Sequence, residues 1–416
     1  MPGRNAVLKI KTLFAILLTF TMVMGSCHSP DSFGEKLGAK VSPYQFSIAG
    51  WEFKSLAQEF NELFSEKDSA PADDSQAVVD YFSVMDKINT EQQAIDAITS
   101  GVMNGDAAAN FSTLAGLEQQ RDMLATKAEY VLEAQLRLTL NSLGIYNPAD
   151  SFLNLKSTFP PVQLRLQEPP KLLIVSPRNQ IGRLATITLD NNMSIEQITA
   201  LENSVSSLDV SSLVVDLGGI ATYPSFVANR YGLQFALSTA AEEWFHQYNF
   251  FRPLGFRYGL EELGVNEPGY IVTMNETLAG MVSQEVGAAL YDKYYASFFP
   301  PSTSTGDGGS TSGFNFNTFM HDTRVQVDSL LAQWQVTQAE DYMEQQRQIL
   351  ASHGYLIRKL NQAFFAFYGS YADQPGFENP IADNFTALRT KSVSLAAFVE
   401  KASNFTNPDE LAQAAK

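Results

Sequence analysis

Apolar residues recur at intervals of three and four over much of the chain, which is the spacing of one face of an amphipathic helix. The pattern starts near Trp51 and continues over 76–100 and 107–143, where the Gln, Glu, Arg and Ala content also favours helix. We therefore expect a helical module at 45–145. The same spacing predicts later helices at 194–207, 233–247, 276–298, 325–352 and 361–367, and two more within 380–412.

Three short segments depart from the helical spacing and predict β-strands, because each is a run of apolar or β-branched residues bounded by turn formers. They lie at 171–176, 184–189 and 213–217. The helix predicted after the second strand begins with Ser194 and Gln197, which have the spacing of a capping box. Because strands and helices alternate in this region, we expect an α+β lobe at 171–298.

Proline-rich and polar stretches separate these regions and predict their boundaries. Residues 146–170 contain five prolines and predict an extended linker. Residues 299–318 are rich in Ser, Thr and Gly, which is typical of a flexible loop. The remaining residues, 319–416, predict a C-terminal helical lobe. The expected fold class is α+β and predominantly helical, with a small sheet that follows an N-terminal helical module.

The N-terminus has the three-part pattern of an export signal. Three basic residues precede an apolar run over 12–24, which is too short to span a membrane. The small residues that follow, together with Cys27, resemble a bacterial lipobox, and Cys27 is the only cysteine of the chain. We therefore expect residues 1–26 to be a signal peptide, Cys27 to carry a lipid anchor at the cell envelope, and 27–44 to form a polar tether. The alternative is a signal peptide followed by an incidental cysteine.

Composition and charge exclude several classes of protein. The chain has 45 acidic and 28 basic residues and a net charge of −17, so phosphate backbones repel it and nucleic acid is not an expected partner. One cysteine excludes an intramolecular disulfide framework, a cysteine-rich zinc site and a CxxC redox pair. A content of 45% hydrophobic and 12% aromatic residues is too high for a disordered chain. The protein is therefore expected to fold by packing alone.

One of the four histidines lies among patterned acids. Glu242 and Glu243 precede His246 by four and three residues, so the three side chains project from neighbouring positions of one helix face. Glu276 lies at the start of a second predicted helix. Two helices that offer carboxylates and one imidazole can surround a divalent ion. A surface histidine beside a solvated acidic face is the alternative, and the spacing alone leaves both open.

Two segments resemble the motifs of gluzincin metallopeptidases. Residues 242–248 (EEWFHQY) are similar to the HEWxHxY form of the HExxH motif, and residues 275–279 (NETLA) are similar to its NExxA partner. The order and spacing also resemble bacterial membrane-anchored proteins with a HEWxH–NETxA core, over roughly 160–400. The resemblance implies a zincin-like core. Glu242 stands where the family has its first histidine.

The resemblance implies a role for each residue at the matched positions. His246 and Glu276 would bind Zn²⁺, and Glu243 would be the general base that takes a proton from the attacking water. Glu242 would be the third ligand, although an anionic ligand makes zinc a weaker Lewis acid. Three outcomes stay open: a working zinc site, a site that prefers Mn²⁺ or Fe²⁺, and an inactive peptidase kept for binding. A di-iron site is disfavoured, because no second Glu-x-x-His exists in the chain.

The resemblance also implies where a peptide substrate would lie. In gluzincins an edge strand before the metal-binding helix hydrogen-bonds an extended peptide. Tyr368 could donate to an oxyanion or pack in an aromatic core. The segment that matches the edge strand could instead be an ordinary Gly-Gly turn. The expected substrate-binding residues are Gly219, Ile220, Ala221 and Tyr223.

The function that the sequence favours is zinc-dependent hydrolysis of peptide bonds at the cell envelope. Its partners would be a peptide or protein substrate and the membrane, through the lipid at Cys27. The alternative is a catalytically inactive surface lipoprotein that binds peptides or proteins. Other hydrolase chemistries lack support, because the sequence contains neither a Ser nucleophile elbow nor a Gly-rich phosphate loop.

Overall fold

The computed structural model is mostly helical, with two small sheets of three strands each among the residues described. This arrangement confirms the predicted α+β class. The predicted signal peptide, Cys27 and the helix near Trp51 lie outside the described residues. The structure describes residues 32–47, 72–99, 105–148, 156–262, 268–299, 314–369 and 380–416.

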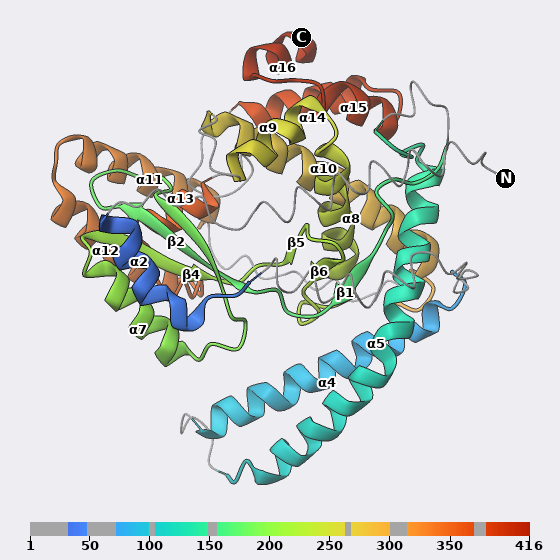
Figure 1. Ribbon diagram of the computed structural model, residues 1–416, viewed down its shortest axis with the longest axis horizontal. Coiled ribbons are helices and arrows are strands. Elements are labelled where there is room, and N and C mark those ends of the chain that lie inside the picture. The colour runs from blue at the N-terminus through green and yellow to red at the C-terminus, as the bar shows by residue number, and fades with distance from the viewer. Residues whose placement is uncertain are drawn as a thin grey trace.

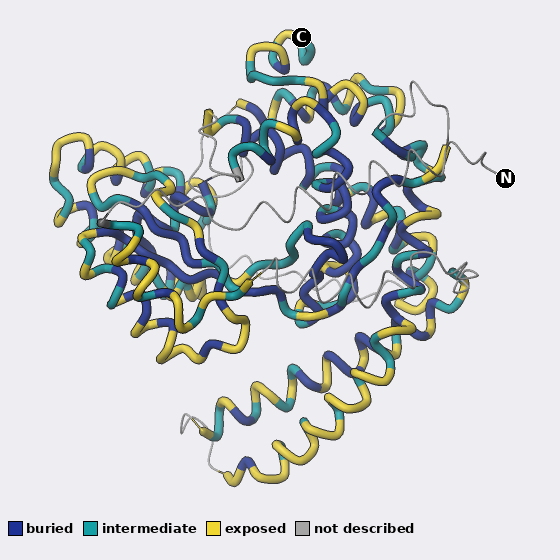
Figure 2. The backbone as a smooth tube through the Cα atoms, viewed as in Figure 1, coloured by how far each residue is buried: buried dark blue, intermediate teal, exposed yellow. Residues whose placement is uncertain are grey.

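Two long helices, α4 (Ser75–Thr99) and α5 (Ala108–Ser142), form a hairpin that projects from the rest of the molecule (Figure 1). They confirm the helices predicted at 76–100 and 107–143. Their apolar faces are buried mainly where the hairpin joins the body, whereas much of its far end is exposed (Figure 2). The hairpin thus shares its core with the body at one end only.

The larger sheet has the antiparallel order β3-β2-β4, built from β2 (Lys171–Pro177), β3 (Ala185–Leu189) and β4 (Val210–Val215). Its two faces are covered by α7 (Ile195–Ser206) and α13 (Gln362–Tyr368). Successive residues of β2 alternate between these faces, as the period of a strand requires. The three predicted strands are therefore confirmed, and both faces of the sheet are buried.

The helix α7 starts at the predicted capping box. Gln197 N donates to Ser194 Oγ at 3.3 Å, and Ser194 N donates to Gln197 Oε1 at 2.9 Å. These two bonds satisfy backbone donors that the first helical turn leaves free.

Residues 32–44 form a packed segment instead of the predicted polar tether. They comprise α2 (Ser32–Val41) and the short 3₁₀ helix η1 (Ser42–Tyr44). Leu37 and Val41, one helical turn apart, are each 1% exposed and pack with α7 and the larger sheet. The prediction was wrong because an apolar stripe four residues apart is enough to cover a neighbouring hydrophobic face.

The smaller sheet has the order β1-β6-β5, with β1 (Leu164–Leu166) parallel to β6 (Ser225–Val227) and β5 (Gly219–Ile220) antiparallel to it. The strand β1 lies inside the segment predicted as a linker. Its backbone N–H groups at Leu164 and Leu166 donate to Glu133 and Glu129 of α5, at 3.0 and 2.8 Å. The linker prediction was wrong here because side chains from a distant helix complete the hydrogen bonding of this strand.

The centre of the body is the packing of α8 (Leu233–Asn249) against α10 (Gly269–Tyr294), with α9 (Pro253–Glu262) beside both. Apolar residues of both central helices, such as Phe245 and Leu278, belong to one buried cluster. The C-terminal segment forms three helices, and not the two predicted within 380–412: α14 (Ile381–Lys391), α15 (Leu395–Ala402) and α16 (Pro408–Ala415). The helices α14 and α15 pack against α10, and α16 packs on α14 (Figure 1).

The segment predicted as one helix at 325–352 is a pair, α11 (Phe316–Ala332) and α12 (Val336–Ser352). The chain turns between them at Trp334, which has φ +61°. This pair packs with α13 beside the larger sheet, whereas α14 and α15 pack with α10 and α16 packs with α14. Residues 319–416 therefore do not form a single lobe, because their apolar faces serve two different cores.

Among the described residues, no helix combines the length and hydropathy needed to cross a lipid bilayer.

The buried position of α2 leads to a test by mutation. Leu37→Ala should lower the free energy of unfolding by about 2–5 kcal/mol, because it removes a fully buried side chain. Gly38→Ala is the matched control: it lies on the exposed side of α2 with free space around it, and should raise stability by about 0.5–1 kcal/mol. Urea unfolding followed by circular dichroism measures both. Equal stability of Leu37→Ala and the parent would contradict the packed position of α2 and support the predicted polar tether.

Candidate metal centre

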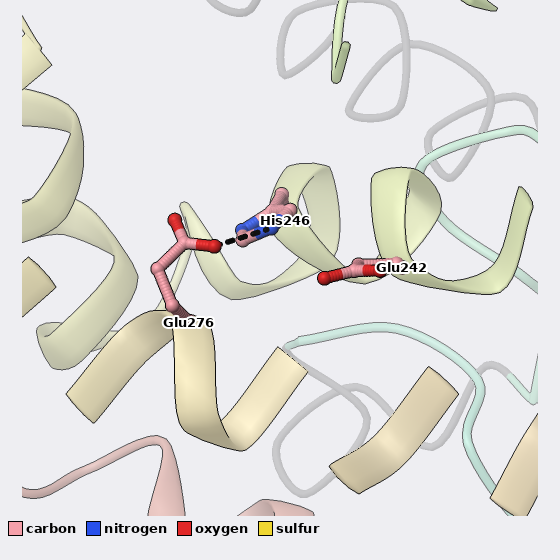
Figure 3. A group of neighbouring side chains, drawn as sticks. All are labelled: Glu242, His246 and Glu276. Carbon is pink, nitrogen blue, oxygen red and sulfur yellow. Dashed lines mark ion pairs between the residues drawn. The ribbon is translucent and has the colours of Figure 1, made fainter. Parts of the chain in front are cut away.

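The side chains of Glu242, His246 and Glu276 converge on one point (Figure 3). Each offers one ligand atom, and the three atoms lie within 4.8 Å of one another. Glu242 and His246 lie one turn apart on α8, and the packing of α10 on α8 brings Glu276 opposite them. His246 Nε2 is 3.7 Å from Glu276 Oε2. The convergence predicted from helical spacing is therefore confirmed.

The geometry of this group suits a small divalent ion. A tetrahedral ion with bonds of about 2.0–2.2 Å holds its ligand atoms roughly 3.4 Å apart. The His246–Glu276 separation is close to that value, and the 4.8 Å limit on the other pairs is within reach of small carboxylate rotations. Glu276 is buried while Glu242 and His246 are half-buried, so the group is not sealed. The three residues could hold a metal ion with side-chain atoms from two helices.

A chain of buried amides orients the His246 ring. The Asn275 side-chain amide contacts His246 Nδ1 at 3.0 Å, and Asn249 Nδ2 donates to Asn275 Oδ1 at 2.8 Å. Both asparagines are completely buried. With the Asn275 nitrogen facing the ring, the ring proton belongs on Nε2. A metal on Nε2 needs that proton on Nδ1 instead, and rotation of the Asn275 and Asn249 amides supplies the required acceptor.

Glu243 lies buried beside this group and below the strand β5. Burial raises the pKa of its carboxyl well above the ordinary value, and the nearby negative charges of Glu242 and Glu276 raise it further. A Cβ atom added at Gly219 would lie 2.4 Å from Glu243 Oε1, so only glycine allows the strand to pass so closely. The carboxyl of Glu243 thus lies against β5 and near the carboxylates of Glu242 and Glu276.

The strand β5 is the terminal strand of its sheet among the described residues. Gly219 and Ile220 form the strand, and Ala221 follows it; all three are half-buried. They lie beside the site as the edge-strand hypothesis requires. Tyr223 is buried, which leaves its side chain little surface for contact with a substrate.

Gln247 fastens the turn between β5 and β6 to the helix α8. Its Nε2 donates to Thr222 O at 2.6 Å and to Ser225 Oγ at 2.9 Å. All three residues are buried. Because Gln247 follows His246 directly, one helical turn carries both the candidate ligand His246 and the side chain that holds the β5–β6 turn.

Tyr368 lies in an aromatic group and not among the ligands. Its ring packs against Phe364 and Phe367 of α13, at centroid distances of 4.5 and 4.9 Å. Burial raises the pKa of the Tyr368 hydroxyl, and negative charge on Asp216 and Tyr231 raises it further. Within the described residues, no contact joins Tyr368 to the three ligands, so the structure gives no support to its predicted role as an oxyanion donor.

The sequence did not single out several residues that shape the site. Tyr258 of α9 stacks on the His246 ring, with centroids 5.6 Å apart and planes 20° from parallel. Asn275 belongs to the matched NETLA segment, which was the one available signal for its contact with His246. No local pattern pointed to Tyr258, Asn249 or Gln247, because their roles depend on how α8, α9, α10 and β5 pack.

The raised pKa of Glu243 predicts how the stability of the metal-free protein depends on pH. Above the ordinary glutamate value of about 4.3 the unfolded chain has lost this proton while the folded chain keeps it, so stability falls as pH rises toward the raised value. Glu243→Gln should therefore raise the melting temperature in a chelator at neutral pH and change it little near pH 4. Scans of melting temperature against pH measure this.

A matched control separates this effect from the loss of a negative charge in general. Glu118→Gln changes an exposed residue on the hairpin helix α5 and should not alter the pH profile. A Glu243→Gln protein less stable than the parent across the whole pH range would contradict the prediction.

Comparisons with known proteins add no further identification. No protein-family model matches the chain, and neither a curated protein nor a solved structure matches it. The resemblance to gluzincins therefore depends on the motif residues alone, and the geometry of the site is the basis for a functional proposal.

Proposed function

We propose that this protein is a zinc-dependent peptidase with a gluzincin-like core, exported and anchored at the cell envelope through a lipid on Cys27. The observation that carries the proposal is the convergence of Glu242, His246 and Glu276 within 4.8 Å. The buried Glu243 and the edge strand β5 beside it support the proposal. The surroundings thus offer a candidate proton acceptor and a place for an extended substrate.

The residues of the site would divide the chemistry between them. Glu242, His246 and Glu276 would hold the zinc ion, which when bound supplies Lewis-acid chemistry toward a carbonyl and a water. Glu243 would take the proton of the attacking water and return it to the leaving amine, and burial, which raises the pKa of its carboxyl, makes it a stronger base than an exposed glutamate. The amides of Asn275 and Asn249 would hold the His246 ring in place.

The strand β5 would align the substrate. An extended peptide can add to the free edge of a sheet and pair its backbone with that edge. The strand β5 passes directly over Glu243, so a peptide paired with it would lie next to the proton acceptor. Main-chain pairing of this kind binds many sequences, because it does not depend on side chains.

Zinc is favoured over the other ions by general affinity. Sites of mixed N and O ligands bind Zn²⁺ more tightly than Mn²⁺ or Fe²⁺. Two carboxylates and one imidazole nevertheless carry more negative charge than a site with two imidazoles, which weakens the ion as a Lewis acid. This charge is the specific observation behind the second candidate function, an inactive surface lipoprotein that binds peptides along the same edge strand.

Metal content and activity test the proposal together. Protein purified without added metal should contain about one zinc ion per chain, and His246→Ala should lose it, because the imidazole is the single nitrogen ligand. Glu243→Gln should keep the zinc and lose roughly 10²–10⁴-fold in activity on a mixed peptide library. Elemental analysis and peptide mass spectrometry measure the two effects.

A second histidine provides the control. His353→Ala alters an exposed residue at the end of α12 and should retain full zinc content. Zinc without hydrolysis would favour the binding protein, and absence of any metal would contradict both the site and the peptidase.

The unusual ligand Glu242 gives a separate prediction. Glu242→His places a neutral imidazole one turn before His246, so zinc affinity should rise by about tenfold or more and activity should rise with it. Glu242→Gln is the matched control, because it removes the charge without supplying the imidazole. Competition with a fluorescent zinc chelator measures the affinities. Weaker binding by Glu242→His than by the parent would show that the site is built for a carboxylate.

A further inference from the structure

Two aromatic side chains are exposed at the N-terminal end of α8, about two helical turns before Glu242. Phe235, at the start of α8, is 38% exposed, and Tyr231, just before the helix, is 48% exposed. Their rings contact each other with centroids 4.7 Å apart and planes at 57°. Adjoining aromatic rings that remain open to water mark a binding surface more often than single exposed residues do.

Charged groups hold this aromatic pair in place. The guanidinium of Arg230 lies over the Tyr231 ring, 4.7 Å from its centroid. Arg230 is itself paired with Glu168 and Asp216, at 3.1 and 3.2 Å. The pair of rings is therefore fixed to the framework of both sheets, and binding a ligand there costs little side-chain entropy.

The aromatic pair lies on the same stripe of α8 as the metal ligands. Phe235, Glu242 and His246 occupy positions i, i+7 and i+11, which fall on one helix face. Seven residues of helix span about 10.5 Å, and an extended peptide covers that distance in about three residues. A peptide that crosses the metal group can therefore reach the two rings.

The strand β5 follows the same path. A Cβ atom at Gly218 would lie 2.7 Å from Phe235 Cζ, and one at Gly219 would lie 2.4 Å from Glu243 Oε1. Adjacent backbone positions at the start of β5 thus touch the aromatic pair and the candidate proton acceptor. A peptide paired with β5 would extend from one to the other.

We propose that Tyr231 and Phe235 form a specificity subsite that binds a large apolar side chain of a peptide substrate, about two or three residues from the bond that is cleaved. This inference rests on the proposed peptidase function. The occupant is a peptide side chain because the subsite is continuous with the edge strand, whose backbone pairing suits an extended polypeptide. Main-chain pairing with β5 would bind peptides of many sequences. The two rings would determine which peptide bond lies at the metal site, because they bind one large apolar side chain.

Cleavage of designed peptides tests the subsite. In a series in which one Phe is moved along an Ala- and Ser-rich peptide, the parent should prefer one position, and kcat/KM there should exceed that of the all-Ala peptide by roughly ten- to hundredfold. Phe235→Ala should remove this preference, so that its kcat/KM is the same for every Phe peptide and for the all-Ala peptide. Phe235→Leu should restore part of it. Phe111→Ala, at a more exposed position on α5, should leave the preference intact.

A binding measurement keeps this test separate from the peptidase test. Fluorescence anisotropy with labelled peptides and the Glu243→Gln protein should show tighter binding of the best Phe peptide than of the all-Ala peptide. Zinc content and circular dichroism establish that Phe235→Ala is folded. Selective binding by this variant together with no cleavage by the parent would contradict the peptidase and support the subsite.

Other results would overturn the subsite alone. Equal binding of the Phe and all-Ala peptides, or a preference that survives in folded Phe235→Ala, contradicts it even if zinc and cleavage are present. Binding of N-acetylglucosamine oligomers in place of Phe peptides, lost in Phe235→Ala, would assign the rings to a carbohydrate and also overturn the proposal.

Discussion

The register between α8 and α10 is the constraint on which the site depends. Apolar packing holds the two helices together, but apolar packing alone tolerates small shifts along their axes. The buried amides of Asn249 and Asn275 do not, because a shift would leave them without partners in a place that water does not reach. Asn275 also contacts His246, so the same bonds that fix the register place the neighbouring Glu276 against the imidazole.

This register concentrates negative charge around one imidazole. Three glutamates approach one another. Burial and the repulsion from Glu242 and Glu276 raise the pKa of the Glu243 carboxyl. A divalent cation would offset the repulsion, so ion binding and folding stability would be coupled. The surroundings of Glu242, Glu243 and Glu276 are fixed by two further contacts. Gln247 binds the β5–β6 turn to α8, and Tyr258 stacks on the His246 ring. The arrangement is therefore more rigid than an acidic surface patch.

Local patterns predicted the elements that depend on local sequence. The alternation of apolar and polar residues along β3 and the spacing of Ser194 and Gln197 are visible in the sequence, as is the one-turn spacing of Glu242 and His246. The failures had other causes. The strand β1 pairs with β6, and Glu129 and Glu133 of α5 complete its hydrogen bonding. The turn at Trp334 divides a continuous helical pattern without a glycine or proline. Neither feature leaves a periodic signal in the sequence.

The close approach of β5 to the helix α8 also links three positions in evolution. A Cβ atom at Gly219 would lie 2.4 Å from Glu243 Oε1 and 2.7 Å from Thr239 Cγ2, so only shorter side chains at both 239 and 243 would open that space. The effect of a substitution at 219 therefore depends on the residues at 239 and 243, which is epistasis with a steric origin. A lineage that shortened both side chains could acquire a side chain in the strand, and that side chain would then block the return of glutamate at 243. Loss of this carboxylate would in this way become difficult to reverse.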